Sequence, residues 1–110
     1  MKYVYIDGHI QEDKMLFECE CFEWDEGNSL KYWEKHKISM GECEQCFFNS
    51  PMILLPPSSD GVDTIRYALL SKSDQDCLLT IVFVVRHNKI RVISARDMSR
   101  KERKLYDKEN

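Results

Sequence analysis

The sequence has no long hydrophobic run. Its longest apolar stretch, Leu78 to Val85, is interrupted by Thr80 and has the length of a β-strand, well short of the ~20 residues of a transmembrane helix. The first residues contain no apolar block of the kind found in a signal peptide. These absences predict a cytoplasmic protein that does not interact with a membrane.

Glycine-based motifs are also missing. The 4 glycines form neither a Gly-rich phosphate loop nor a Gly-x-Ser-x-Gly motif. The 5 cysteines are an odd number, which argues against a disulfide framework and indicates reduced thiols. A chain of 110 residues without internal repeats predicts a single domain, 1–110, with residues 1–15 as an extension or mobile arm and residues 16–108 as the core.

Local patterns predict an α+β fold. Two helices are expected early in the chain, one capped by Asp25 with Leu30, Trp33 and His36 at helical spacing, and one starting at Ser39 and ending near Phe48. A further capping box, Ser99 to Glu102, predicts a last helix to about residue 108. Strands are expected at 16–24, 52–55, 64–71, 77–86 and 89–96, with a hairpin turn at His87-Asn88.

Charge is divided unevenly along the chain. Residues 86–110 contain nine Lys/Arg and four Asp/Glu, whereas residues 1–85 contain seven Lys/Arg and fifteen Asp/Glu. The net charge of the whole chain is only −3. A basic end on an acidic chain indicates a site for a polyanion such as RNA or DNA. A solvated basic helix is the alternative interpretation.

Arginines are the strongest candidates for such a site. Four are expected on strands or strand ends and two on the last helix, namely Arg66, Arg86, Arg91, Arg96, Arg100 and Arg103. A guanidinium fork binds phosphate bidentately and could stabilise charge that develops during RNA cleavage. Simple alternation places Arg91 and Arg96 on opposite faces, so the strand arginines can share one surface only if a bulge or a strand end re-aims some of them.

Other side chains could move protons or contact bases. Lys31 and His36 are candidates for proton transfer, although a solvated lysine and a histidine at a helix C-terminus are the simpler interpretations. Tyr106 could stack on an RNA base, or it could pack against the sheet.

The cysteines suggest a different class of protein. A CxC and a CxxC motif supply four thiols that could form a tetrahedral zinc site, from Cys19, Cys21, Cys43 and Cys46. However, Cys43 and Cys46 fall on the apolar stripe of the second helix, where cysteine behaves as a small hydrophobic residue.

Several motifs, in order along the chain, resemble one known family. They are Phe22-Glu23-Trp24-Asp25, Lys35-His36-x-Ile38-Ser39, Glu42 with Phe47-Phe48-Asn49, Arg66-Tyr67, and Ile90-Arg91-Val92-Ile93-Ser94-Ala95-Arg96 with Arg100-Lys101-Glu102-Arg103 and Tyr106. Together they are similar to the BrnT toxins of bacterial type II toxin–antitoxin modules. By position, the basic residues of the family match Lys31, Arg66, Arg91, Arg96 and Arg100.

The resemblance implies a RelE-like fold, in which an antiparallel β-sheet packs against two N-terminal helices and a C-terminal helix follows. It implies a ribonuclease toxin that cleaves RNA to inhibit translation. A ribbon-helix-helix antitoxin would neutralise it, and the complex would bind operator DNA through the antitoxin and repress its own operon.

The hypothesis drawn from these patterns is a metal-independent endoribonuclease without a cofactor. In it, Arg66, Arg91 and Arg96 hold the phosphate, and Lys31 or His36 moves a proton. Arg86, Arg100, Arg103 and Tyr106 contact RNA. The alternatives are a non-catalytic module that binds antitoxin or nucleic acid, and a small zinc-binding protein. The acidic N-terminal two-thirds would suit a basic antitoxin segment.

Overall fold

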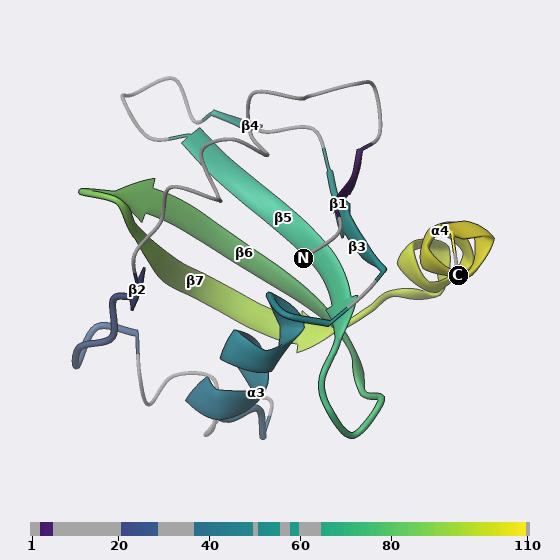
Figure 1. The fold of residues 1–110 in the computed structure, drawn as a ribbon, viewed down its shortest axis with the longest axis horizontal. Helices are drawn as coiled ribbons and strands as arrows, with labels where there is room; N and C mark the ends of the chain where they lie inside the picture. Colours follow the sequence, from purple (N-terminus) through teal and green to yellow (C-terminus); the bar gives the residue numbers. More distant parts are fainter. Residues whose placement is uncertain are drawn as a thin grey trace.

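The computed structural model describes residues 3–5, 21–28, 37–49, 51–55, 58–59 and 65–109. Along the chain the elements are β1 (Tyr3–Tyr5), β2 (Cys21–Phe22), α3 (Met40–Cys46), β3 (Met52–Leu54), β4 (Ser58–Ser59), β5 (Ile65–Lys72), β6 (Leu78–Arg86), β7 (Lys89–Asp97) and α4 (Arg100–Glu109) (Figure 1). The expected α+β class is confirmed, and strands β5 to β7 begin and end within one residue of their predicted bounds.

The sheet is mixed rather than antiparallel throughout. Its strand order is β1-β3-β5-β6-β7-β2, and β4 pairs with β5. The central pairs β3–β5, β5–β6 and β6–β7 are antiparallel as predicted, but the outer pairs β1–β3 and β2–β7 are parallel. Only strands joined by a tight turn must be antiparallel, and β1 and β2 pair with strands far away in the sequence. β1 lies within the segment expected to be an extension or mobile arm.

A two-residue hairpin joins β6 to β7. Arg86 pairs with Lys89, and the two residues between them, His87 and Asn88, have φ angles of 53° and 60°. Positive φ at both central positions is the signature of a type I′ turn, whose twist matches that of the flanking strands. The predicted hairpin is therefore confirmed.

A β-bulge interrupts the register of this hairpin. Val82 lies opposite Ser94, whereas the next residue of β6, Phe83, lies opposite Val92. Ile93 is thus one extra residue in β7. Such a bulge shifts the side-chain alternation of the bulged strand by one position.

The shift changes which residues of β7 share a face. Ile90, Val92 and Ala95 are all buried in one hydrophobic cluster, although strict alternation would separate Ala95 from the other two. Arg91 and Arg96 therefore both point to the opposite face of the sheet. The bulge, which alternation alone could not predict, therefore places these two arginines on the same face.

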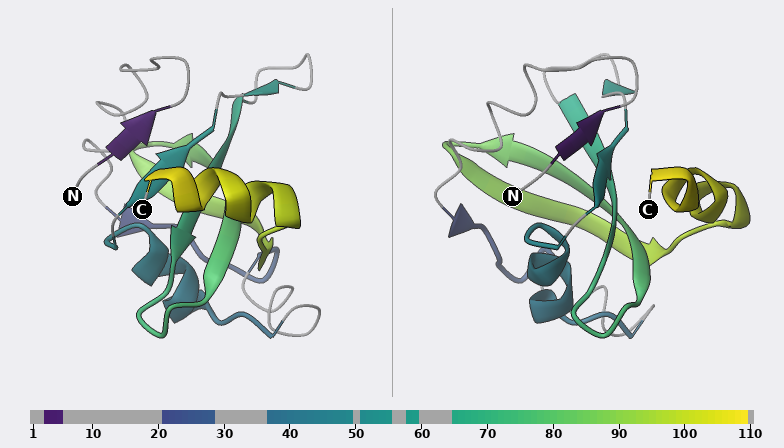
Figure 2. Two further views of the ribbon diagram at one scale, coloured as in Figure 1. Left: turned by 90° about the vertical axis from the view of Figure 1, so that its right-hand side faces the viewer. Right: turned by 45° about the vertical axis from the view of Figure 1, so that its right-hand side comes forward.

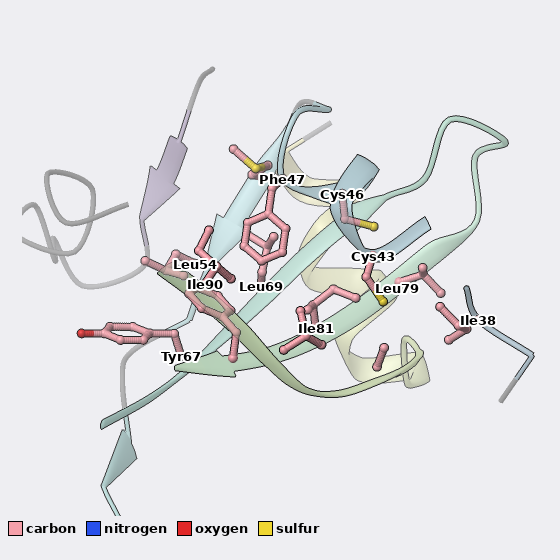
Figure 3. Packing of buried hydrophobic residues seen from close by; sticks show 14 residues of the cluster. Ile38, Cys43, Cys46, Phe47, Leu54, Tyr67, Leu69, Leu79, Ile81 and Ile90 are labelled. Atoms are coloured by element: carbon pink, nitrogen blue, oxygen red, sulfur yellow. The ribbon is translucent and has the colours of Figure 1, made fainter. Parts of the chain in front are cut away.

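The two described helices cover opposite faces of the sheet (Figure 2). On one face, Cys43, Cys46 and Phe47 of the α3 segment pack against β5, β6 and β7, where Leu69 and Ile81 lie beneath them (Figure 3). On the other face, α4 buries one stripe of its residues against β3 and β5. In the described part of the chain, no helix has the length and apolarity needed to cross a membrane.

The capping boxes predicted for both helices are present. The Ser39 side chain accepts a hydrogen bond from the Glu42 backbone N–H at 3.2 Å, and α3 ends at Cys46, two residues before the predicted end. The corresponding bond before α4, from the Glu102 backbone N–H to Ser99 Oγ, is also 3.2 Å. The helix predicted to start at Asp25 falls largely on residues 29–36, outside the described residues.

Candidate functional site

Four arginines lie on the α4 side of the sheet, a surface called here the arginine face and defined by Arg66, Arg86, Arg91 and Arg96. Tyr67 belongs to the hydrophobic cluster between α3 and the sheet, and Val85 packs against that cluster. Successive side chains of a strand alternate between the two faces, so Arg66 and Arg86 point to the opposite face. The bulge adds Arg91 and Arg96 to the same side. The strand arginines therefore do share one surface.

At one end of this face, two arginines are paired with two carboxylates from the segment after β2. Arg91 donates to Asp25 through both terminal nitrogens, at 2.8 Å and 3.0 Å, and to Glu23 at 3.0 Å. Arg86 donates to the same Glu23 oxygen at 2.7 Å. The side chain of Arg91 is only 19% exposed. The four side chains form a chain of alternating charges whose net charge is zero.

These contacts shift the protonation equilibria of all the acidic partners. Hydrogen bonds from Arg86 and then Arg91 lower the pKa of Glu23, and the bond from Arg91 lowers the pKa of Asp25. The bond to Asp25 raises the pKa of Arg91 in turn. Both carboxylates are ionised at neutral pH and are weak proton acceptors.

Asn28 fixes this acidic segment, residues 23–28, to the sheet. Its side chain is 3% exposed, and its amide nitrogen donates to the backbone oxygens of Glu23 and Val92, both at 3.0 Å. Its amide oxygen accepts from the Asp25 backbone N–H at 2.8 Å. The bond to Val92 reaches β7 immediately before the bulge, so one buried amide positions the carboxylates over Arg91.

Gly27 allows the close approach of Arg91 to this segment. A Cβ atom at position 27 would lie 3.1 Å from Arg91 Nη2 and 3.1 Å from Asp25 Oδ1, closer than ordinary van der Waals contact. Asp25, predicted as a helix cap, accepts the Gly27 backbone N–H at 2.8 Å. The helix that Asp25 was predicted to cap lies outside the described residues, and the sequence pattern did not predict the pairing of Asp25 with Arg91.

At the other end of the arginine face, Arg96 is paired with Glu102 of α4. Its terminal nitrogens lie 2.7 Å and 3.0 Å from the two carboxylate oxygens. Glu102 also accepts from Thr80 Oγ1 at 2.9 Å and from the Ser99 backbone N–H at 2.8 Å. The bond from Arg96 is the main cause that lowers the pKa of Glu102 to about 2. Glu102 thus joins β6, β7 and α4 while remaining ionised.

The remaining predicted site residues fall in different places. Arg66 and Arg100 are exposed, and Arg103 is exposed with its Nε donating to the Met98 backbone oxygen at 3.3 Å. Lys31 and His36 lie outside the described residues. The four strand arginines therefore share one face of the sheet, and the residues expected to transfer protons are not placed relative to it.

Tyr106 lies in the core and not on the surface, where a base could stack on it. Its side chain is 0% exposed and clusters with Ile53, Leu70 and Met98, and its hydroxyl donates to the Pro51 backbone oxygen at 2.8 Å. Burial raises the pKa of Tyr106 to about 12. A ring enclosed in this way has no free face for a base, so the structure supports packing against the sheet, not base stacking.

Cys43 and Cys46 also lie in the core. Both belong to α3, are 0% exposed and pack in the cluster between this helix and the sheet. Burial raises the pKa of each thiol to about 12. Cys21 is exposed, and Cys19 lies outside the described residues. Among the residues that are described, no group of three or more His, Cys, Asp or Glu side chains is placed to hold a metal ion. Cys43 and Cys46 act here as small hydrophobic residues.

A comparison of the sequence with protein-family models assigns the chain to one family. Residues 24–102, more than two thirds of the chain, match the model of the family described as "Ribonuclease toxin, BrnT, of type II toxin-antitoxin system". The chain belongs to this family of ribonuclease toxins. A comparison with curated proteins gave no significant match. The matched range contains the acidic segment except Glu23, the arginine face and the start of α4 up to Glu102.

The carboxylates of the site were not predicted from the sequence as partners of the arginines. Glu23 and Asp25 lie 68 and 66 positions from Arg91, and Asn28 lies 64 positions from Val92. Such pairs leave no local signal. Glu102 was identified only through its capping box, which does not reveal that the same carboxylate binds Arg96.

Proposed function

We propose that this BrnT-family chain is a metal-independent endoribonuclease whose arginine face binds the RNA phosphate at the point of cleavage. In this reaction the RNA 2′-hydroxyl attacks the adjacent phosphorus, and the bond from phosphorus to the 5′-oxygen of the next nucleotide breaks. The products are a 2′,3′-cyclic phosphate and a free 5′-hydroxyl. The observation that supports this proposal is the presence of Arg66, Arg91 and Arg96 on one face of a rigid sheet.

The arginines act as electrostatic groups in this mechanism. Negative charge builds up on the non-bridging phosphate oxygens as the 2′-oxygen attacks, and guanidinium groups stabilise such charge through paired N–H donors. Arg86, Arg100 and Arg103 extend the basic surface towards the neighbouring phosphates of the strand. These three residues contribute to affinity more than to the chemical step.

Proton transfer is assigned to Lys31 or His36. The carboxylates Glu23, Asp25 and Glu102 are held ionised by arginines, which makes them poor general bases. In the sequence, Lys31 comes three residues after Asn28, which is fixed to β7. In this proposal Lys31 or His36 accepts the proton of the attacking 2′-hydroxyl.

The RNA phosphate must compete with the carboxylates already bound to the arginines. Arg91 is bound by Asp25 and Glu23, and Arg96 is bound by Glu102. Binding of RNA would therefore exchange one anion for another at these positions.

In the cell, the proposed consequence is inhibition of translation in the cytoplasm. The family membership supports an antitoxin partner and an RNA substrate. We further propose that the antitoxin carries a ribbon-helix-helix domain, and that the complex binds operator DNA through that domain and represses its own operon.

The experiment combines purified protein, a labelled RNA oligonucleotide and its 2′-deoxy analogue. We expect cleavage of the RNA in the presence of EDTA, a 2′,3′-cyclic phosphate product, and no cleavage of the analogue. Arg66→Ala and Arg96→Ala should reduce the rate by about 100-fold, whereas Lys89→Ala, an exposed control on the hairpin, should not. Cleavage of the analogue, or loss of all cleavage in EDTA, would reject this mechanism.

A non-catalytic binding module is the second candidate, and one observation favours it. Arg91 and Arg96 are already neutralised by carboxylates of the same chain. A module of this kind would bind RNA or antitoxin without cleaving RNA. Binding of the labelled RNA without any product, by correctly folded protein, would support this candidate instead.

A further inference from the structure

A second surface feature lies on the far side of Glu102 from the Arg96 pair. An open groove of about 480 Å³ runs along α4 and is lined by Leu55, Lys101, Glu102, Lys104, Leu105 and Lys108. Leu55 follows β3, and α4 lies across the sheet at this edge (Figure 2). The volume is within the range of about 300–1,000 Å³ that is typical of ligand sites.

The floor of the groove is apolar. Leu55 and Leu105 both pack, half-buried, against the cluster that contains Tyr106. They continue the hydrophobic core outwards to the surface between β3 and α4. A partner that covers these two leucines would extend the core with its own apolar side chains.

The rim of the groove is basic. Lys101, Lys104 and Lys108 are spaced by three and four residues, so they lie on one side of α4, and all three are exposed. Their aliphatic stems add apolar surface next to Leu105, while their ammonium groups remain in water. The apolar floor and the positively charged rim together favour a partner that has an apolar face flanked by negative charges.

We infer that this groove docks an acidic amphipathic helical segment of the antitoxin. Leucine-like side chains at positions i, i+3 or i+4, and i+7 would lie on Leu55 and Leu105, and flanking carboxylates would face the three lysines. The inference rests on the proposed function for the identity of the partner. It contrasts with the sequence-based interpretation, in which a basic antitoxin segment binds the acidic N-terminal part of the chain.

The lining favours a protein segment over RNA. None of the described residues that line the groove is aromatic, so these residues offer no platform on which bases could stack. Its half-buried leucines would gain little from a phosphate backbone. Among the described lining residues the one acidic side chain is Glu102. It is already bound to Arg96 at 2.7 Å and does not oppose an acidic partner with a free charge.

Glu102 connects the groove to the arginine face. It lines the groove and also binds Arg96 and Thr80. A segment docked here would lie directly beside an arginine assigned to the phosphate. Neutralisation of the toxin would then follow from the position of the bound antitoxin, without a change of fold.

The test measures affinity and activity on the same variants. The probe is the purified protein encoded by the open reading frame adjacent to the gene of this chain, titrated into the full chain by calorimetry. The groove variant is Lys104→Glu/Lys108→Glu. The matched control, Lys37→Glu/Lys89→Glu, makes the same change of net charge at exposed lysines away from α4.

We expect the groove variant to bind the probe at least about tenfold more weakly than the wild type does. The affinity of the control variant should stay within about twofold of the wild-type affinity. Both variants should have the melting temperature and the RNA-cleavage rate of the wild type. Equal affinity of groove variant and wild type, or no binding of the probe to the wild type, would overturn the inference. Loss of RNA affinity with unchanged probe affinity would identify an RNA surface and also overturn it. Failure of the proposed function would appear separately, as no RNA cleavage by any variant.

Discussion

Arg96 and Glu102 form an ion pair with two hydrogen bonds, 2.7 Å and 3.0 Å long, that joins the last strand of the sheet to the first turn of α4. The same carboxylate completes the capping box of α4 and accepts a bond from Thr80. One side chain therefore positions an arginine of the proposed site and also stabilises the start of the helix that forms the groove. The consequences of this arrangement can be measured.

Replacing Glu102→Gln should destabilise the fold by about 1 kcal/mol. The substitution keeps the shape of the side chain but removes the charge that strengthens the bonds to Arg96 and interacts favourably with the helix N-terminus. The loss is small because Arg96 is 43% exposed and solvent screens the pair. Urea unfolding measures the change. Asp107→Asn, which neutralises an exposed acid on the same helix, should leave the midpoint unchanged, and an equal loss in both variants would contradict the role of Glu102.

The contribution of Glu102 should depend on pH in a defined window. Its pKa is lowered from 4.5 to about 2 by the bond from Arg96, so the folded state favours the ionised form. The stabilisation is fully present above about pH 4.5 and is lost as the pH falls towards 2. The difference in unfolding free energy between wild type and Glu102→Gln should shrink across this window. A difference that is constant from pH 5 to pH 2 would show that the charge of Glu102 does not stabilise the fold.

Replacing Asn28→Asp should cost about 2 kcal/mol of stability. The side chain keeps its size and its acceptor for the Asp25 N–H, but it loses the N–H donors to Glu23 and Val92 and places a charge in a buried position. Chemical denaturation measures the loss, and hydrogen exchange should be faster at the backbone N–H of Asp25. Gln75→Glu, a matched amide-to-acid change in an exposed turn, serves as the control; equal stability of both variants would show that Asn28 does not fix the segment.

Arg91 and Arg66 should respond differently to replacement by alanine. Arg91→Ala removes the three bonds that tie the acidic segment to β7, so it should lower the melting temperature and RNA cleavage together. Arg66 is exposed at the start of β5, so Arg66→Ala should reduce cleavage by about 100-fold with a smaller change in melting temperature than Arg91→Ala. Melting curves and single-turnover cleavage on the same samples separate the two roles. Identical behaviour of the two variants in both measurements would contradict this distinction.

Replacing Tyr106→Phe should affect stability and leave RNA affinity unchanged. The change removes the bond from the hydroxyl to the Pro51 backbone oxygen, which costs about 1 kcal/mol, and the ring stays in the core. Equilibrium unfolding and RNA binding are measured in parallel. Tyr106→Leu, which removes the aromatic ring from the same buried site, should also leave RNA affinity unchanged in the folded protein. A folded Tyr106→Leu variant with weakened RNA binding would restore the base-stacking role expected from the sequence.

The sequence by itself determined those features that depend on residues close together in the chain. The capping boxes at Ser39 and Ser99 and the turn at His87-Asn88 are set by contacts within four residues, so their patterns predict them directly. The motifs from Phe22 to Tyr106 were also sufficient to identify the family, which the comparison over residues 24–102 confirmed.

The tertiary structure alone decided how the site is assembled. The bulge at Ile93 arises from the packing of β6 against β7, and it places Arg91 and Arg96 on one face where simple alternation separates them. The pairing of Arg91 with Asp25 joins residues 66 positions apart. The parallel pairing of β2 with β7 and the burial of Tyr106 follow from packing over similar distances in the sequence. Local propensity carries no information about such contacts, because their partners are neighbours only after the chain has folded.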